Sequence, residues 1–317
     1  MRQTLACLAL ALLSAACVPR VQKPGAERAA PALTDSAYLT ADGKSLPLAR
    51  WTPEGPPQAV VVAVHGFNDY RRAFNGTGAF LAERGILTLA YDQRGFGENE
   101  DAGIWTPGDV LADDLLGLLA LVRAAHPDVP VYVLGMSMGG AVSLHALSRS
   151  TAPPDGVVLV APAVWGWSTM NPFYKATLWL AAHTVRGWRP SGRSLHIKAS
   201  DNVEMLRAQG RDPYIIKKTR IDAVYGLVGL MDDALEAAPK LKLPILLLYG
   251  GNDQIIPARS MQALRRRLGK HEYKFYSDGY HMLLRDLDGA KVLADVARWL
   301  EDGYSPSKSP SRVPRAL

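Results

Sequence analysis

The chain has 317 residues, of which 48% are hydrophobic and 21% are charged, and its formal net charge at pH 7 is +6. This balance is that of a globular protein and excludes a disordered chain or one embedded in a membrane. The length exceeds one ordinary domain and fits a single large α/β domain that carries an insertion. Both cysteines, Cys7 and Cys17, lie near the N-terminus, so the predicted core contains no disulfide.

The N-terminus has the pattern of an export signal. Arg2 provides a positive charge, residues 5–16 form an apolar run, and small residues precede Cys17. The run is too short to span a bilayer, which needs about twenty apolar residues. A Pro-, Gly- and Ala-rich stretch follows, and such a composition does not pack as a buried helix. We therefore predict a signal peptide over residues 1–16.

The segment LSAAC, which ends at Cys17, resembles a bacterial lipobox, in which the cysteine is lipidated and becomes the new N-terminus. Its leucine, Leu13, stands one residue further upstream than is usual. The resemblance implies an exported bacterial cell-envelope lipoprotein that faces the periplasm and is held at the membrane surface by its lipid. An ordinary signal peptidase could cut at the same bond, which would give a periplasmic or secreted protein. Residues 17–35 are predicted to be the lipidated cysteine and a flexible linker.

Strands and helices are predicted to alternate along the chain. The apolar, β-branched run of residues 58–65 predicts a buried strand, and further strands are predicted over residues 86–91, 131–135, 156–161, 243–249 and 272–276. Between them, helices are predicted over residues 73–85, 109–126, 137–148, 257–268 and 286–300. Residues 37–40 and 45–52 predict an antiparallel hairpin at one edge. The alternation indicates the α/β class, with a mostly parallel central sheet and helices on both faces.

One interruption, between residues 162 and 239, is too long for a loop and contains apolar patches of its own. We interpret it as an inserted helical cap, and the name cap is kept below for residues 162–239. The α/β core is then predicted in two parts, residues 36–161 and 240–302. Residues 303–317 are basic and rich in Pro and Ser, which predicts a disordered tail.

Ser137 lies in the segment GMSMGG, directly between a predicted strand and a predicted helix. A G-x-S-x-G match is weak alone, but this context is the one that a nucleophile elbow requires. Side chains at Gly135 or Gly139 would collide with neighbouring backbone in so tight a turn. A serine that only caps the helix is the simpler alternative, and an acid and a base that follow two later strands argue against it.

An acid and a base follow two later strands. Asp253 comes after the strand and glycine turn LLLYGGND, and His281 comes after the last predicted strand. Because carboxyl ends of parallel strands meet at one edge of a sheet, these side chains are expected to meet Ser137. The chain order Ser, Asp, His is that of the α/β hydrolases. The other histidines lie on helices, in the cap or at the start of a strand, and we interpret them as surface or packing residues.

These residue types suit acyl transfer. A neutral His281 would take the proton of Ser137, while Asp253 would orient the imidazole and stabilise its protonated form. The tetrahedral oxyanion would need backbone N–H donors, for which we predict Met138 and Phe67. His65, in the loop that carries Phe67, is predicted to be structural.

Five segments in order resemble the monoacylglycerol lipase and lysophospholipase branch of the α/β hydrolases: HGFNDYRRAF, YDQRGFGENE, GMSMGG, LLLYGGNDQIIP and GYHMLLRD. The resemblance covers roughly residues 36–302. It implies the α/β-hydrolase fold, the triad named above and lipid ester substrates. Two residues depart from the family pattern: Glu98 replaces a common serine, and Phe74 stands where an aromatic hydroxyl is common. Both departures concern fine substrate contacts.

The cap combines aromatic and basic residues. Four of the seven tryptophans lie within it, and Trp165, Trp167, Phe173 and Trp179 are the candidates for substrate contact. Residues 175–220 contain ten Lys or Arg against three acids, a local charge of +7. This combination suits a lipid–water interface, although simple packing of a small domain would also explain the tryptophans. No nucleic-acid-binding module is found, so a nucleic-acid partner is not expected.

The sequence thus predicts a serine esterase that cleaves single-chain acyl esters, monoacylglycerols or lysophospholipids, through an acyl-enzyme, with no metal and no cofactor. A general carboxylesterase or a serine aminopeptidase-like peptidase is the alternative among enzymes. A non-catalytic lipid-binding protein on a hydrolase scaffold is the alternative from another class.

Overall fold

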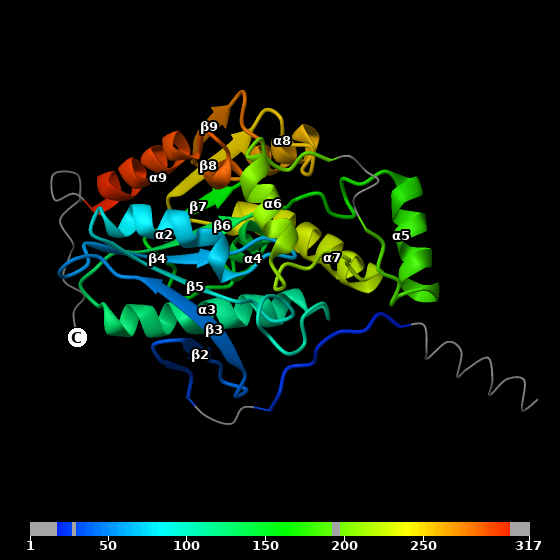
Figure 1. Cartoon of the computed structure of the whole chain (residues 1–317), viewed down its shortest axis with the longest axis horizontal. Helices are drawn as coiled ribbons and strands as arrows, with labels where there is room; N and C mark the ends of the chain where they lie inside the picture. Colours follow the sequence, from blue (N-terminus) through cyan, green and yellow to red (C-terminus); the bar gives the residue numbers. More distant parts are fainter. Residues whose placement is uncertain (1–17, 27–29, 192–196, 305–317) are drawn as a thin grey trace, which may run out of the picture.

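The computed structural model describes residues 18–26, 30–191 and 197–304 (Figure 1). The predicted signal peptide, Cys17 and residues 305–317 of the predicted tail lie outside the described residues. Within the described ranges, no helix is both long enough and apolar enough to cross a membrane.

A central nine-stranded sheet organises the described residues, in the order β1-β2-β3-β5-β4-β6-β7-β8-β9. The strands from β5 to β9 in this order are parallel, and β1, β2 and β3 are added antiparallel at one edge. The predicted fold class and edge hairpin are therefore confirmed. The strands are β1 (Ala32–Leu33), β2 (Ala37–Leu39), β3 (Ser45–Trp51), β4 (Ala59–Val64), β5 (Ile86–Tyr91), β6 (Val131–Met136), β7 (Gly156–Val160), β8 (Ile245–Gly250) and β9 (Glu272–Tyr276).

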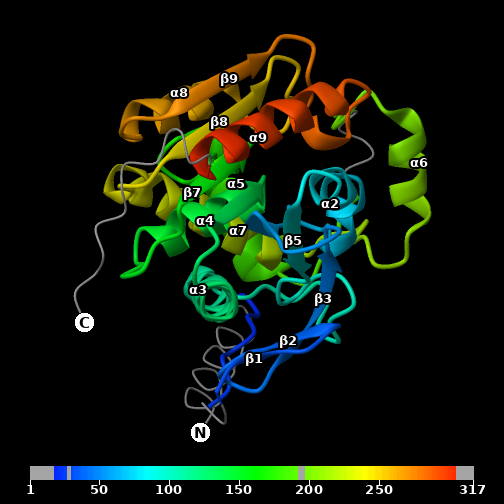
Figure 2. The ribbon, with the colours of Figure 1, turned by 90° about the vertical axis from the view of Figure 1, so that its left-hand side faces the viewer.

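Helices cover both faces of the sheet (Figures 1 and 2). Apolar residues of α2 and α9 belong to the core on one face, and those of α3, α4, α7 and α8 belong to the core on the other. The helices are α2 (Asn75–Ala82), α3 (Gly108–Ala125), α4 (Met138–Leu147), α5 (Pro172–Thr184), α6 (Val203–Arg211), α7 (Ile221–Ala237), α8 (Ala258–Arg267) and α9 (Gly289–Tyr304), with short 3₁₀ helices η1 (Arg71–Phe74), η3 (Ala238–Lys240) and η4 (Leu283–Arg285).

Strand β4 shows why these sequences form a buried parallel sheet. All six of its residues are buried. Because successive side chains of a strand point to opposite faces, Val60, Val62 and Val64 join the core under α3 and α4, whereas Ala59 and Val61 join the core under α2 and α9. A continuous apolar run, with no polar face, follows from burial on both sides.

The cap consists of α5, α6 and α7, which lie in the chain between β7 and β8. Helix α7 packs against α4 and against α5. In Figure 2, α6 lies on the far side of α2, well away from α3. The cap therefore reaches the core both at α4, the helix that follows Ser137, and at the loops near α2.

Two segments differ from expectation. The helix predicted over residues 73–85 is a 3₁₀ turn, η1, followed by a shorter α2 that ends at Ala82. The predicted flexible linker is also corrected. Residues 18–26, called the N-terminal strap below, are hydrogen-bonded to the body, and β1 of residues 32–33 joins the sheet.

The strap is held by polar partners that its own composition does not reveal. The N–H of Arg20 donates to Asp222 (3.1 Å), and the N–H of Gln22 donates to the carbonyl of Trp105 (2.7 Å). A Pro- and Gly-rich stretch cannot build a core, but its backbone groups can still bind a preformed surface. The surface is provided here by residues about 80 to 200 positions away.

Candidate active site

Ser137 lies between β6 and α4, with φ of 53° and ψ of −117°. For a residue other than glycine, such a backbone conformation costs about 1–3 kcal/mol of strain. Glycines make the turn possible: a Cβ at Gly139 would collide with the carbonyl oxygen of Val64, and one at Gly135 would lie 2.6 Å from the carbonyl oxygen of Gly139. The sequence GMSMGG therefore folds as a strained turn that holds the hydroxyl at the beginning of α4.

Three side chains predicted from the sequence lie in hydrogen-bonding contact. His281 Nε2 is 2.9 Å from Ser137 Oγ, and His281 Nδ1 is 2.8 Å from Asp253 Oδ2. The imidazole and the carboxylate are almost completely buried, with 5% and 0% of their side chains exposed. The expected meeting of residues from β6, β8 and β9 at one edge of the sheet is thus present in the structure.

The hydrogen bonds around Asp253 determine the tautomer of His281. A carboxylate can only accept, so Nδ1 carries the hydrogen and Nε2 is left to accept from the Ser137 hydroxyl. The other oxygen of Asp253, Oδ1, accepts from the N–H groups of Ile255 (2.8 Å) and Ile256 (2.9 Å). The carboxylate is therefore fixed on both sides, and it aims Nε2 at the serine.

Glycines also bring the acid loop and the histidine loop together. A Cβ at Gly250, the last residue of β8, would collide with the carbonyl oxygen of Gly279. The N–H of Asn252 donates to that same carbonyl at 2.9 Å. The turn after β8 and the turn after β9 thus share backbone contacts, which is why Asp253 and His281 meet although 28 residues separate them.

The two residues predicted to bind an oxyanion through their N–H groups, Met138 and Phe67, each directly follow a residue of the turn around Ser137 or one packed against it. Met138 is the first residue of α4, and the first N–H groups of a helix have no partner within it. Phe67 follows Gly66, where an added Cβ would lie 3.3 Å from Ser137 Cβ. The loop of Phe67 is bound to the cap, since the carbonyl of Asn68 accepts from the N–H of Ile216 at 3.1 Å.

His65 supports this loop from below, as expected. Its Nε2 accepts from the N–H of Gln93 (3.0 Å), so its Nδ1 carries the hydrogen that is donated to the carbonyl of Gly66 (2.8 Å). Burial lowers the pKa of His65, which favours this neutral form. His65 thus joins the loop after β4 to the loop after β5.

Comparison with known proteins adds to this geometry. Residues 55–288, most of the chain, match the family model described as serine aminopeptidase, S33. The chain belongs to this family. Monoglyceride lipase of Rattus norvegicus is 28% identical over 273 residues, which cover 83% of this chain and 88% of the relative. Monoacylglycerol lipase of Mycolicibacterium smegmatis is 26% identical over 254 residues, covering 79% and 90%.

Among solved structures, the crystal structure of Paleococcus ferrophilus monoacylglycerol lipase superposes with a TM-score of 0.67 at 20% identity. It covers 81% of this chain and 99% of that chain. The chain is thus an α/β hydrolase of the monoacylglycerol lipase-like branch of the S33 family, as the five sequence segments predicted.

The four aromatic residues of the cap that were predicted to contact substrate fall into two groups by their burial. Trp165 and Trp167 are partly buried and pack against the core. Phe173 and Trp179 on α5 are exposed, with 69% and 53% of their surface accessible. The packing explanation therefore applies to the first pair. The second pair is directed to solvent.

The two departures from the family pattern have structural partners. Glu98 forms an ion pair with Arg71 (2.8 Å), and Arg71 forms a second ion pair with Asp92 (2.5 Å). Phe74 is fully buried in the core under α2. Glu98 therefore extends a charged network behind η1, and Phe74 fills core volume.

Sequence reasoning missed several residues that hold the loops of this S33 site. Asn68 and Thr219 connect the Phe67 loop to the cap, and Asp286 binds the backbone next to His281. Asp286 lies within the segment GYHMLLRD, five residues after the histidine, which was its only signal. No pattern in the sequence marks Asn68 or Thr219, because their contact joins positions 151 residues apart.

Proposed function

We propose that the protein hydrolyses single-chain acyl esters, monoacylglycerols or lysophospholipids, through an acyl-enzyme on Ser137. The observation that carries the proposal is the continuous hydrogen-bonded relay from Ser137 through His281 to Asp253. Such a relay activates a hydroxyl that is otherwise a poor nucleophile at neutral pH.

In the first half-reaction, Ser137 Oγ attacks the ester carbonyl carbon while His281 Nε2 takes the hydroxyl proton. The imidazolium is stabilised by Asp253, and the oxyanion is bound by the N–H groups of Met138 and Phe67. Collapse of the tetrahedral intermediate breaks the bond to the alkoxy oxygen, and His281 returns its proton to that oxygen. The alcohol leaves, and the acyl group stays on Ser137.

In the second half-reaction, water attacks the acyl carbonyl and His281 takes its proton. The same two N–H groups bind the second oxyanion. When this intermediate collapses, Ser137 Oγ leaves and receives the proton from His281. One ester and one water are consumed, and one carboxylic acid and one alcohol are formed, with the enzyme restored.

The substrate class is supported by the two relatives reported above, which are named as lipases of monoacylglycerols. The test is a panel of purified esters that varies acyl length and headgroup, run with wild type and with Ser137→Ala. We expect long-chain monoacyl substrates to be preferred over short p-nitrophenyl esters, and Ser137→Ala to lose both turnover and fluorophosphonate labelling. Labelling of the Ser137→Ala protein would overturn the assignment of the nucleophile.

Peptide hydrolysis is the second candidate, because the matching family is described as serine aminopeptidases. The Ser137–His281–Asp253 relay can cleave an ester bond or a peptide bond by the same steps. The substrate panel therefore includes N-terminal aminoacyl amides. A higher kcat/KM for these amides than for every ester would favour the peptidase. A higher kcat/KM for short-chain esters than for long-chain monoacyl substrates, whatever the headgroup, would favour a general carboxylesterase.

We propose further that the protein is an exported lipoprotein whose cap faces a membrane. The proposal is supported by the lipobox-like segment at Cys17 and by the position of the strap. The carbonyl of Val18 accepts from Arg186 (2.5 Å), just beyond the C-terminal end of α5, so the chain reaches the body beside that helix (Figure 1). Exposed apolar residues gather on and next to α5: Phe173, Tyr174, Trp179, Leu180, Val185 and Trp188.

Aromatic rings and basic side chains are suited to the depth of lipid headgroups. The test compares membrane fractions of cells that express wild type or Cys17→Ser. We expect wild type in the membrane fraction and resistant to high salt, and Cys17→Ser in the soluble periplasmic fraction. Equal distribution of the two proteins would overturn the anchor.

A further inference from the structure

Asp286 follows η4, and its carboxylate is buried. Each of its two oxygens accepts a hydrogen bond. Its Oδ2 accepts from the N–H of Tyr280 at 2.7 Å, and its Oδ1 accepts from the hydroxyl of Ser200 at 2.6 Å. Tyr280 is the residue before His281. Ser200 belongs to the cap and is fully buried. One carboxylate thus joins the backbone of the histidine loop to a side chain of the cap.

Further hydrogen bonds join the same two segments. The N–H of Met282 donates to the carbonyl of Ala199 (3.0 Å), and the Asn202 side chain donates to the carbonyl of Arg285 (3.1 Å). The N–H of Leu287 donates to Asp201 (2.9 Å). The segment that follows His281 is therefore joined to the cap by several hydrogen bonds, and among those that involve side chains the bond from Ser200 to Asp286 is the buried one.

We propose that Asp286 is a positioning residue that holds His281 in register with Ser137 by clamping its loop to Ser200 of the cap. The inference rests on the proposed role of His281 as general base. Asp286 touches neither the imidazole nor the serine, so its effect is exerted through the backbone at Tyr280.

The physical argument concerns the length of the hydrogen bond to the serine. His281 is carried by a turn, and the direction of its ring depends on the backbone immediately before it. Without this acceptor, the partly buried N–H of Tyr280 would need a new partner, and the turn would move. A shift of about 1 Å in a reacting group can lower turnover by about a hundredfold.

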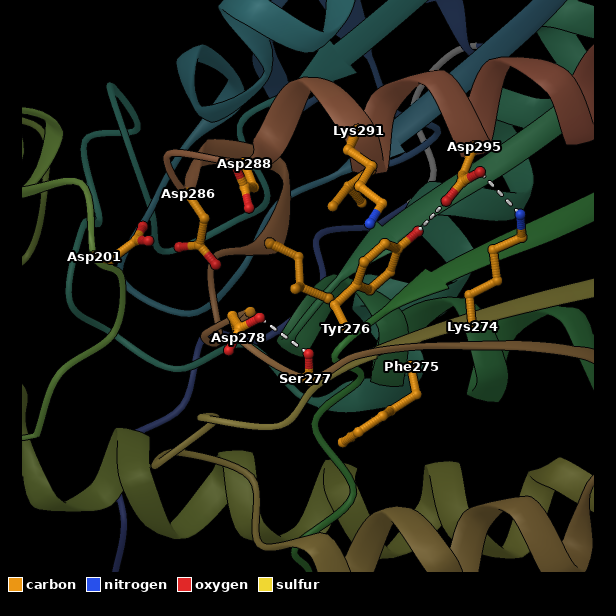
Figure 3. Close-up of a pocket in the computed structure, with 13 residues that line it drawn as sticks. Asp201, Lys274, Phe275, Tyr276, Ser277, Asp278, Asp286, Asp288, Lys291 and Asp295 are labelled. Atoms are coloured by element: carbon orange, nitrogen blue, oxygen red, sulfur yellow. Dashed lines mark hydrogen bonds and ion pairs between the residues drawn. The ribbon is translucent and has the colours of Figure 1, made fainter.

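Asp286 is bonded to Tyr280 and Ser200 and also borders a cavity. A cavity of about 330 Å³ borders it and is lined by Asp201, Asp278 and Asp288 (Figure 3). Figure 3 shows the Asp286 side chain among these acids, below the beginning of α9. Burial raises the pKa of Asp286, while its bonds to Ser200 and Tyr280 act in the opposite direction. The neighbouring charges that act on it are Asp201 and His281.

The experiment measures kcat and KM per active site, with sites counted by fluorophosphonate labelling, for wild type, Asp286→Ala and Asp286→Asn. Asn is isosteric: its oxygen can accept from Tyr280 and its NH₂ can donate to the oxygen of Ser200. We expect Asp286→Ala to lower kcat by about tenfold or more with little change in KM, and Asp286→Asn to restore kcat to within about threefold of wild type. Asp288→Ala is the matched control, since this acid is exposed two residues away and should keep wild-type kcat.

Wild-type kcat per labelled site in Asp286→Ala would overturn the proposal, even if its melting temperature fell. Equal losses in Asp286→Ala and Asp286→Asn would also overturn it, because the loss would then come from charge and not from the clamp. If wild type itself is not labelled at Ser137, the proposed function fails first, so the two failures are distinguishable.

A milder variant keeps the test open if Asp286→Ala does not fold. Ser200→Ala removes one partner of the clamp from the cap side. We expect it to lower kcat by about twofold to fivefold at unchanged KM, both in wild type and in Asp286→Asn, whose amide can keep the bond to Ser200. Wild-type kcat in Ser200→Ala would overturn the coupling of His281 to the cap.

Discussion

The side-chain amide of Asn68 donates to the hydroxyl of Thr219 at 2.7 Å. Asn68 directly follows Phe67, whose N–H is proposed to bind the oxyanion, and Thr219 belongs to the cap. Asn68 also has a φ of 64°, a conformation that asparagine tolerates better than most residues. The cap therefore holds the oxyanion loop through Thr219, as it holds the histidine loop through Ser200.

Replacement of Thr219 tests this contact. Thr219→Val keeps the shape of the side chain and removes the hydroxyl, so the loop of Phe67 loses one restraint. We expect kcat/KM to fall by about fivefold, which corresponds to about 1 kcal/mol of transition-state stabilisation. Thr219→Ser keeps the hydroxyl and should retain wild-type kcat/KM. Equal values for the Val and Ser variants would show that the contact does not affect the reaction.

Two glycines within helices should respond to alanine in opposite ways. Gly139→Ala would push its Cβ into the carbonyl oxygen of Val64, at the end of β4, and displace the turn of Ser137. We expect a loss of about 3 kcal/mol in the free energy of unfolding, at the upper end for overpacking, and loss of ester hydrolysis. Urea unfolding followed by circular dichroism would measure it.

Gly229→Ala is the control for that variant. Nothing lies within 4 Å of the position that a Cβ at Gly229 would take in α7. Alanine is the better helix former, so we expect a gain of about 0.5–1 kcal/mol in the free energy of unfolding and unchanged activity. Destabilisation by Gly229→Ala, or a well-folded active Gly139→Ala protein, would contradict the packing described here.

His65 should make the protein sensitive to mild acid. Because burial lowers its pKa below the ordinary 6.5, the unfolded chain binds the proton more readily than the folded protein does. The stabilisation is therefore complete above pH 6.5 and is lost as the pH falls below that value, by at most about 1.4 kcal/mol per pH unit.

Unfolding of wild type and His65→Asn in urea, at pH 7.5 and at pH 5.5, measures this linkage. We expect His65→Asn to be less stable at pH 7.5, because its contacts with Gly66 and Gln93 change. Its stability should fall less than that of wild type between the two pH values. Parallel losses in the two proteins would assign the acid sensitivity to other groups.

The N-terminal strap should contribute to stability although it lies outside the core. Asp222 is almost fully buried and accepts from the N–H of Arg20 as well as from the side chain of Arg220 (2.6 Å). A protein that begins at residue 30 lacks the strap, whereas one that begins at Val18 keeps it. We expect the shorter protein to lose about 1–3 kcal/mol in the free energy of unfolding. Identical urea midpoints would show that the strap is not bound in solution.

These features separate what the sequence could predict from what it could not. Ser137, Asp253 and His281 could be located because each follows a segment of strand length, and the parallel order places the ends of those strands together. The contacts of Asp222, Thr219 and Ser200 could not, because a single polar pair has no periodicity. Such pairs form only after the sheet and the cap have placed distant backbone segments side by side.

The sequence predicted that a helix is present more accurately than it predicted the residues at which the helix begins and ends. The apolar pattern after residue 73 indicated one helix, and the structure begins it as the 3₁₀ turn η1 at Arg71. Arg71 is drawn into the interior by Asp92, which accepts from both its backbone N–H (2.8 Å) and its guanidinium. A tertiary ion pair therefore determines the helix start, and local propensity does not contain that information.

Asp253→Asn offers the sharpest test of how the carboxylate works. Its Oδ1 accepts from the N–H groups of Ile255 and Ile256, so an asparagine oxygen would stay at that position. The NH₂ would then face His281 Nδ1, which would have to accept, and the hydrogen of the imidazole would move to Nε2. An Nε2 that carries a hydrogen cannot take the proton of Ser137. We expect kcat to fall on the order of 10⁴-fold at unchanged fold stability within about 1 kcal/mol; a loss smaller than about tenfold in steady-state ester hydrolysis would mean that Asp253 does not set the tautomer.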